Sequence, residues 1–224
     1  VLMIAGCFAA CGSEQAQNET TQPTVTEPPE EAKTLKVLTL GHSLSVDAGH
    51  MLALIAAKEG YQDLKLGTLY YSGCSLPAHV KFLTENSRAY ELYLSSTTTP
   101  DEPPTVMQSV TMGDAIRLDY WDIIIMQGGV FEIAEDATFK NGNIQIIQNF
   151  VNENKKNPNA VFYWNMTWAF PVDKELRDMY PMEPNVYYRD YAKYNDDRAT
   201  MYNAIAQCVK DNILTDETFV GMIP

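Results

Sequence analysis

The sequence predicts an α/β sandwich built around a mainly parallel β-sheet. Short apolar runs that are typical of strands alternate along the chain with longer segments in which apolar residues recur at helical spacing. One run, 122–126, is apolar over its length after the first residue, which is typical of a strand covered on both faces. The chain has 224 residues, of which 46% are hydrophobic and 20% charged, so one such domain with appendages is expected.

The expected elements begin with a strand, a helix and a second strand. The apolar run 35–40 predicts a strand that ends at Gly41. The segment 47–59 predicts an amphipathic helix that stops at Gly60, because four apolar residues occur in it at helical spacing: Met51, Leu52, Leu54 and Ile55. A second strand is expected over 64–71.

A helix, a hairpin and a second, shorter helix are expected next. The helix over 77–86 begins with Pro77, since proline suits the first turn of a helix. Residues 87–110 hold Thr- and Pro-rich turns between strand-like pieces, and this pattern predicts a hairpin insertion. Thr111 is expected to cap a short helix that runs to Arg117.

The last part of the chain completes the alternation after the strand at 122–126. The pattern predicts a helix near 138–155, a strand over 160–164, an irregular Pro- and Tyr-rich insertion over 171–196, a helix over 198–211 and a buried strand over 219–223.

Residues 1–11 predict part of a secretory signal peptide. The run is apolar and uncharged, which suits an export signal but is too short to span a bilayer. Phe-Ala-Ala before Cys11 resembles the lipobox of bacterial lipoproteins, in which the cysteine is lipidated after cleavage, and Cys7 is a competing match. The alternative interpretation is a buried amphipathic segment. We therefore expect a protein exported and anchored to the bacterial cell envelope through lipid on Cys11, with no other contact to the membrane.

The remaining terminal regions carry two further expectations. Residues 12–34 are rich in Glu, Gln, Thr and Pro without apolar periodicity, and this composition predicts a disordered acidic tether. The domain then covers 35–224. Because a core strand such as 219–223 seldom ends a domain, the domain is expected to be truncated at its C-terminus.

The charge of the chain argues against two classes of partner. Acidic residues outnumber basic residues by 29 to 16, which gives a formal net charge of −13. A protein that coats nucleic acid needs Lys and Arg to displace counterions from phosphates, so no nucleic-acid partner is expected. The same charge argues against electrostatic docking on an anionic membrane.

No metal or other cofactor is expected. The histidines His42, His50 and His79 have no metal-ligand spacing. The segment after the first strand lacks the Gly-x-Gly-x-x-Gly pattern of a dinucleotide site. Four scattered cysteines are too few for a disulfide framework, and Cys74 and Cys208 either pair outside the cell or remain buried thiols.

Polar and glycine-rich segments follow four of the predicted strands. Ligands bind at the carboxyl ends of strands in open parallel sheets, so these segments are candidates for a site. In chain order they are Gly41-His42-Ser43-Leu44-Ser45, Ser72-Gly73-Cys74, Gln127-Gly128-Gly129 and Asn165-Met166-Thr167-Trp168.

These segments resemble those of the SGNH, or GDSL-type, hydrolase superfamily over residues 35–224. The likeness is to an uncharacterised secreted lipoprotein branch with a Gly-x-Ser-x-Ser opening, which here is residues 41–45, and with a Thr-Trp-Ala segment, which here is residues 167–169. His42 stands where the opening Gly-Asp-Ser-Leu has aspartate. The resemblance implies a three-layer α/β/α sandwich with a flavodoxin-like sheet.

The resemblance also implies roles for three residues. Ser43 would be the nucleophile, and the N–H groups of Ser43 and Gly73 would donate to the oxyanion. Gln127 stands where the superfamily has an asparagine donor, and its side chain is one methylene longer. Without catalysis, Ser43 would be a helix-capping serine, a role that Ser45 could fill equally well.

No residue of the chain matches the base of the superfamily. That base belongs to an Asp-x-x-His block near the C-terminus, and this block is missing here. The segment 47–50 also reads Asp-x-x-His, but it lies in the first predicted helix, so we interpret it as a chance match. His42 should diverge from the adjacent Ser43, and His79 is expected at the surface or lining the site.

Aromatic residues suggest the substrate. Trp168, Tyr187 and Tyr188 are expected to bind it, because aromatic faces stack on the C–H surfaces of sugars. The sequence therefore predicts a serine esterase that removes acyl groups, and most plausibly acetyl groups, from carbohydrate at the cell surface. The alternative is a non-catalytic glycan-binding lipoprotein that keeps the same fold.

Overall fold

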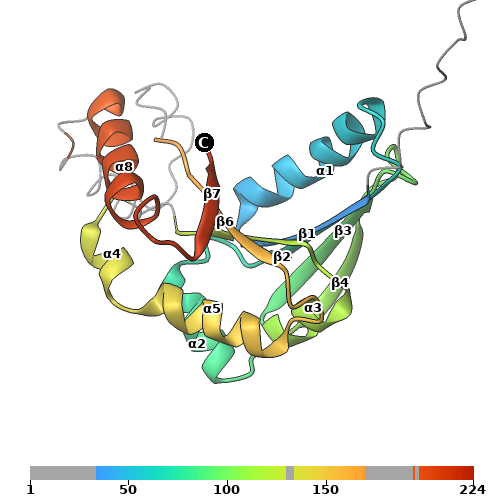
Figure 1. The fold of residues 1–224 in the computed structure, drawn as a ribbon, viewed down its shortest axis with the longest axis horizontal. Coiled ribbons are helices and arrows are strands. Elements are labelled where there is room, and N and C mark those ends of the chain that lie inside the picture. The colour runs from blue at the N-terminus through green and yellow to red at the C-terminus, as the bar shows by residue number, and fades with distance from the viewer. Residues whose placement is uncertain (1–33, 130–133, 170–193, 195–196) are drawn as a thin grey trace, which may run out of the picture. The chain divides into compact units, whose positions relative to one another are not determined.

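The computed structural model describes residues 34–129, 134–169, 194 and 197–224, without the side chains of Thr34 and His50 (Figure 1). The chain divides into two units, 1–31 and 32–224, and the fold described here belongs to the second. The predictions of a signal peptide over 1–11 and of a tether over 12–34 lie almost wholly outside the described residues, as does most of the insertion predicted over 171–196.

Seven strands form one mostly parallel sheet in the order β4-β3-β2-β1-β5-β6-β7. The parallel strands are β1 (Thr34–Gly41), β2 (Asp63–Tyr70), β5 (Ile123–Gln127), β6 (Val161–Asn165) and β7 (Phe219–Ile223). Numbered among themselves, they have the spatial order 2-1-3-4-5, which is the flavodoxin-like order. The prediction of an α/β fold with a mainly parallel sheet is confirmed.

An antiparallel hairpin, β3 (Tyr90–Ser96) and β4 (Thr105–Val110), occupies the outer edge of β2. The hairpin predicted over 87–110 is therefore present. It is not a separate insertion, however, because its strands continue the hydrogen-bonded ladder of the central sheet.

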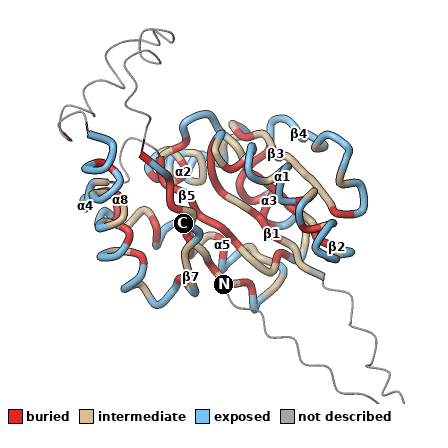
Figure 2. Tube along the Cα trace, turned by 90° about the horizontal axis from the view of Figure 1, so that it is seen from above, coloured by how far each residue is buried: buried red, intermediate tan, exposed pale blue. Residues whose placement is uncertain are grey.

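Helices flank both faces of the sheet (Figure 1). On one face α1 (Ser43–Lys58) packs on the strands through a small core cluster, and on the other face α2 (Leu76–Thr84), α3 (Met112–Leu118) and α5 (Asn143–Asn154) cover a larger one. The short α4 (Asp136–Lys140) contacts α8 (Arg198–Asn212), whose buried side chains join the larger cluster. Buried residues follow the strands between these helices (Figure 2).

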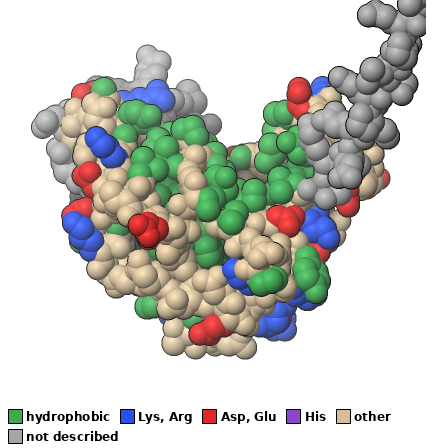
Figure 3. All heavy atoms as spheres, viewed as in Figure 1, with side chains coloured by type: hydrophobic (Ala, Val, Ile, Leu, Met, Phe, Trp, Pro, Cys, Tyr) green, Lys and Arg blue, Asp and Glu red, His purple; other side chains and the backbone are tan. Residues whose placement is uncertain are grey.

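The first helix differs from its prediction in both its start and its orientation. It begins at Ser43 rather than near 47, and three of the four apolar residues expected to define its packing face are about half exposed: Met51 (54%), Leu52 (45%) and Ile55 (52%). The small residues Ala53 and Ala56 face the sheet instead, because they let the helix approach the strands closely. Figure 3 shows hydrophobic side chains lining a hollow beside this helix.

Three smaller differences concern the second half of the chain. The helix predicted near 138–155 is two helices, since Gly142 adopts a left-handed backbone conformation (φ 82°) between α4 and α5. The strand predicted over 219–223 is present but is the sheet's outer strand, so Val220 and Ile223 are exposed. The cap predicted at Thr111 is confirmed as a capping box with Asp114.

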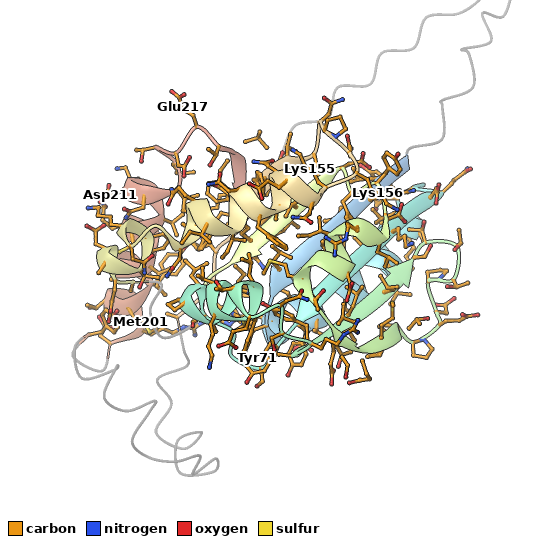
Figure 4. The ribbon with its side chains drawn as sticks, turned by 90° about the horizontal axis from the view of Figure 1, so that it is seen from below. Tyr71, Lys155, Lys156, Met201, Asp211 and Glu217 are labelled. Carbon is orange, nitrogen blue, oxygen red and sulfur yellow. The ribbon has the colours of Figure 1, made fainter. Side chains whose placement is uncertain are left out.

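Figure 4 distinguishes two edges of the sheet, one at which the parallel strands begin and one at which they end. Tyr71 directly follows β2 and Met201 lies in the first turn of α8, and both lie along the same edge of the domain. Lys155 and Lys156, which precede β6, and Glu217, which precedes β7, lie along the opposite edge. The carboxyl ends of the parallel strands and the start of α8 therefore share one edge.

Candidate functional site

The strand order has a switch point between β1 and β5, and the crevice that such a switch point leaves in open α/β sheets is the candidate site. The chain leaves β1 toward β2 on one side, and the later strands β5 to β7 are added on the other side. Connections that depart in opposite directions leave an open crevice at the carboxyl ends of the two adjacent strands, where α/β proteins bind ligands. The segments that enter this crevice are Gly41 to Ser45 after β1 and Gln127 to Gly128 at the end of β5.

A buried hydrogen bond fixes the orientation of Gln127. Ser45 donates from its hydroxyl to Gln127 Oε1 at 2.7 Å, and both side chains are buried. Gly41 makes this contact possible, because a Cβ atom there would lie 2.5 Å from Ser45 Oγ and 3.0 Å from Gln127 Oε1. The Gln127 amide nitrogen is buried and has no partner among the described residues. Gln127 is thus a glutamine whose acceptor is engaged and whose two N–H donors are bonded to none of the described residues.

His42 connects the same two segments through a second contact. Its Nε2 lies 3.2 Å from the carbonyl oxygen of Gly128, and the ring is 1% exposed. Burial lowers the pKa of His42, although the bond to the Gly128 carbonyl opposes this shift. The neutral ring therefore donates to Gly128, so that its Nε2 is directed at β5 rather than at the neighbouring Ser43.

Ser43 is the first residue of α1 and is exposed. His42 occupies the N-cap position, and no side chain caps the helix, so the interpretation of Ser43 or Ser45 as a helix cap is wrong. The N–H of Ser43 has no intrahelical acceptor, and the positive end of the helix dipole favours negative charge beside it. The Ser43 hydroxyl makes no hydrogen bond with any residue that the structure describes.

Gly73 lies on the turn after β2, at the same edge of the sheet. Pairing of Gly41 with Tyr70 aligns the ends of β1 and β2, and a bond from Cys74 N–H to the Tyr71 carbonyl (3.2 Å) closes the turn. Gly73 has φ 59°, a left-handed conformation that favours glycine, and open space surrounds the position of its absent Cβ. The backbone of this turn is therefore accessible from solvent.

A buried pair of rings lies behind the crevice, and sequence reasoning missed it. His79 Nδ1 is 2.8 Å from the Tyr90 hydroxyl, and the rings stack with centroids 5.7 Å apart. His79 is 1% exposed, so the expectation of a surface or lining residue is wrong. Burial, together with the nearby His42, lowers the pKa of His79 to about 3, and its Nε2 has no partner among the described residues. The one sequence signal for the burial of His79 is its spacing of three residues from Leu76, which places both on the buried side of α2.

The lowered pKa of His79 predicts that the folded domain loses stability in acid. Because its folded pKa lies below its unfolded value of about 6.5, the unfolded state binds more protons between these values. The contribution of His79 to stability is therefore complete above about pH 6.5 and is lost as the pH falls toward 3. The test variant is His79→Gln, which keeps an acceptor for Tyr90. Urea unfolding measures the free energy of unfolding at each pH. Between about pH 4 and 6, this free energy should rise with pH less steeply in the variant, by about 1 kcal/mol per pH unit. Tyr90→Phe is the control, because it retains the titrating ring. Equal slopes for His79→Gln and the unmodified protein would contradict this account.

Other predicted site residues lie elsewhere or outside the description. Trp168 is 51% exposed and lies after β6, where it lines a pocket of about 520 Å³ with the start of α8. Tyr187 and Tyr188 lie outside the described residues. Asp47 and His50 belong to α1, and the His50 side chain is outside the description.

Three features are absent from the part of the chain that the structure describes: a metal-binding cluster, a membrane-spanning helix and a disulfide. Among the described residues, no group of three or more His, Cys, Asp or Glu side chains is arranged to hold a metal ion. No helix in the described ranges has the length and apolarity needed to cross a membrane. No disulfide joins Cys74 to Cys208; Cys74 is buried and Cys208 is half-buried.

The chain is an α/β protein whose flavodoxin-like sheet carries an exposed serine after β1 and an anchored glutamine at the end of the adjacent strand β5. It belongs to the family described as "Domain of unknown function (DUF4886)", whose sequence model matches residues 36–220. No curated protein matches it.

Two solved structures resemble this fold. A crystal structure of a DUF4886 family protein from Bacteroides uniformis ATCC 8492 has a TM-score of 0.71 and 24% sequence identity, over 86% of this chain and 67% of that one. A proposed SGNH hydrolase from Slackia heliotrinireducens has a TM-score of 0.40 and 15% identity, over 80% of this chain and 76% of that one. The first likeness shows that the α/β fold with its central sheet is that of the family.

Proposed function

We propose that this protein is an SGNH-type serine hydrolase that cleaves acyl esters, with Ser43 as the nucleophile. The observation that carries the proposal is the anchored amide of Gln127. Its Oε1 is held by Ser45, which leaves a buried, oriented nitrogen donor at the carboxyl end of β5, the strand next to the one that Ser43 follows. A buried donor that no described residue uses is available to a ligand or an intermediate, and this availability supports a catalytic role.

The proposed reaction begins with attack of Ser43 Oγ on the acyl carbon. The carbonyl π bond breaks to give an oxyanion, which accepts hydrogen bonds from the N–H groups of Ser43 and Gly73 and from Gln127 Nε2. The positive end of α1 stabilises the same charge. Collapse of this intermediate expels the alcohol and leaves an acyl-serine, which water then hydrolyses.

The Ser43 proton must pass to a base and then to the leaving alcohol. None of the described side chains is hydrogen-bonded to Ser43, and the rings of His42 and His79 are engaged with Gly128 and Tyr90. The resemblance to the superfamily implies that the base is the histidine of a C-terminal Asp-x-x-His block, and neither His42 nor His79 matches it.

The proposed substrate is an acyl ester, and in particular an acetyl ester, on carbohydrate. The exposed indole of Trp168 at the same edge of the sheet supports a sugar as the alcohol component. The proposal includes export and anchoring through lipid on Cys11, which would bring the enzyme to glycans of the cell envelope.

A second candidate is a non-catalytic glycan-binding lipoprotein. It is favoured by the replacement of aspartate by His42 in the opening motif and by the lack of a base at Ser43 among the described residues. Covalent labelling separates the two candidates, because only an activated serine reacts with an alkyl fluorophosphonate, forming an O–P bond as fluoride leaves.

The full-length natural protein should therefore form a phosphonate adduct at Ser43, located by peptide mass spectrometry. The same experiment on Ser43→Ala should yield no adduct, and Ser96→Ala, which alters a serine near the opposite edge of the sheet, should label normally. Absence of an adduct from the unmodified full-length protein would favour the binding protein over the enzyme.

A further inference from the structure

A pocket of about 520 Å³ lies at the start of α8, and its described lining residues do not include Ser43, Gly73 or Gln127. The described residues that line it are two aromatic side chains, one charged side chain of each sign and two alanines: Trp168, Ala169, Asp197, Arg198, Ala199 and Tyr202. Trp168 follows β6, and Tyr202 lies just over one helical turn into α8. Because β6, β5 and β1 are parallel, Trp168 and Ser43 both follow the carboxyl ends of strands at the same edge of the sheet.

The two aromatic side chains of the pocket are each about half exposed and line the same hollow. Trp168 is 51% and Tyr202 is 46% exposed, whereas Trp121 and Trp164 are each 1% exposed. Rings of this size are normally well buried, so two exposed ones lining the same pocket indicate a surface used for binding. Their electron-rich faces attract the slightly positive C–H groups on the flat side of a sugar ring.

The charges in the pocket favour an uncharged ligand. Asp197 accepts hydrogen bonds from the N–H groups of Ala199 and Thr200 and from the Thr200 hydroxyl, so the positive end of α8 is already occupied by a carboxylate. An incoming anion would meet this carboxylate in a protein with a formal net charge of −13. Arg198 is exposed, and its guanidinium can donate to hydroxyl groups.

From these observations we infer that the Trp168–Tyr202 pocket binds a ring of a neutral oligosaccharide. One sugar ring contacts the faces of Trp168 and Tyr202, while Arg198 donates hydrogen bonds to its hydroxyls. The inference rests on the proposed function in one respect, namely that the bound chain would present an esterified neighbouring sugar to Ser43.

Tryptophan fluorescence offers a direct test. Because Trp121 and Trp164 are buried, the part of the acrylamide quenching that Trp168→Phe abolishes is assigned to Trp168. The probes are xylo-, cello-, manno- and N-acetylglucosamine oligosaccharides, and the full-length natural protein is used. At least one series should protect Trp168 from quenching, with a Kd of about 0.1 to 1 mM.

Variants assign the protection to the pocket. Tyr202→Ala and Arg198→Ala should each weaken binding by about tenfold. Tyr120→Ala should leave binding unchanged; Tyr120 is 60% exposed and precedes β5, so it lies near the opposite edge of the sheet. Calorimetric titration of Trp168→Ala should show loss of binding, and Trp168→Phe should recover part of it.

Several results would overturn the inference. The first is that no oligosaccharide series protects Trp168 from quenching at about 10 mM. The second is that Tyr202→Ala and Tyr120→Ala are protected equally. The third is that short-chain phospholipid, and not sugar, protects Trp168. Ser43→Ala should bind the protective oligosaccharide as tightly as the unmodified protein. Binding without any ester hydrolysis would overturn only the proposed function, and hydrolysis without protection would overturn only the pocket.

Discussion

Replacing Ser43 by alanine is expected to lower kcat/KM for hydrolysis of an activated acetyl ester by at least about 10⁴-fold in the full-length natural protein. The substitution removes the attacking oxygen, so the acyl-enzyme route is closed, while the oxyanion donors remain. Since the Ser43 side chain is exposed and makes no described hydrogen bond, the thermal unfolding midpoint should not change. Steady-state kinetics and calorimetry measure the two effects separately.

The matched control is Ser96→Ala, which should keep the rate within about twofold because Ser96 lies near the amino end of β2, where it pairs with Lys65. A rate for Ser43→Ala within about tenfold of the unmodified protein would contradict the assignment of the nucleophile.

Gln127→Glu is expected to have the second largest effect, a loss of about 10²- to 10³-fold in kcat with little change in KM. The new side chain has nearly the same shape, but it replaces the free N–H donors by an oxygen. If the side chain is ionised, its negative charge also faces the developing oxyanion. A donor used only in the transition state affects kcat rather than KM, so the split between the two parameters tests the role directly.

The matched control for Gln127→Glu is Gln148→Glu. Gln148 on α5 is buried to a similar degree, and its Nε2 donates to Thr218 at 2.7 Å. Both variants bury a carboxyl group and should lower the unfolding midpoint, but only Gln127→Glu should lower the kcat of the folded protein. If both reduced activity in proportion to the unfolded fraction, Gln127 would serve the fold alone.

The sequence was sufficient to predict the sheet because each parallel strand is a short apolar run followed by glycine or polar residues. It was insufficient to orient α1. Met51, Leu52 and Ile55 are the most apolar residues of that helix, yet Ala53 and Ala56 pack on the sheet. A hydrophobic pattern ranks side chains by polarity, whereas a close helix–sheet contact selects them by size. The outer position of β7 was also hidden, since strand order depends on pairing rather than on composition.

The candidate site was predictable as a set of segments but not as a set of contacts. The carboxyl-end rule identified the turns that carry Ser43, Gly73 and Gln127, and the structure brings them to one edge. Two features could not be derived from their sequence positions: the bond from Ser45 that orients Gln127, and the buried pairing of His79 with Tyr90. Both depend on side-chain directions that only the packed domain defines.

The tight packing at Gly41 limits how this region can vary in evolution. The position of a methyl group at residue 41 is already filled by Ser45 Oγ at 2.5 Å and Gln127 Oε1 at 3.0 Å. These two atoms also share a hydrogen bond, so neither can retreat without breaking it. A larger residue at 41 is therefore compatible only with a smaller residue at 45, and that exchange would release Gln127. Positions 41, 45 and 127 should consequently be inherited together, and a lineage that altered one of them would have to rebuild the crevice.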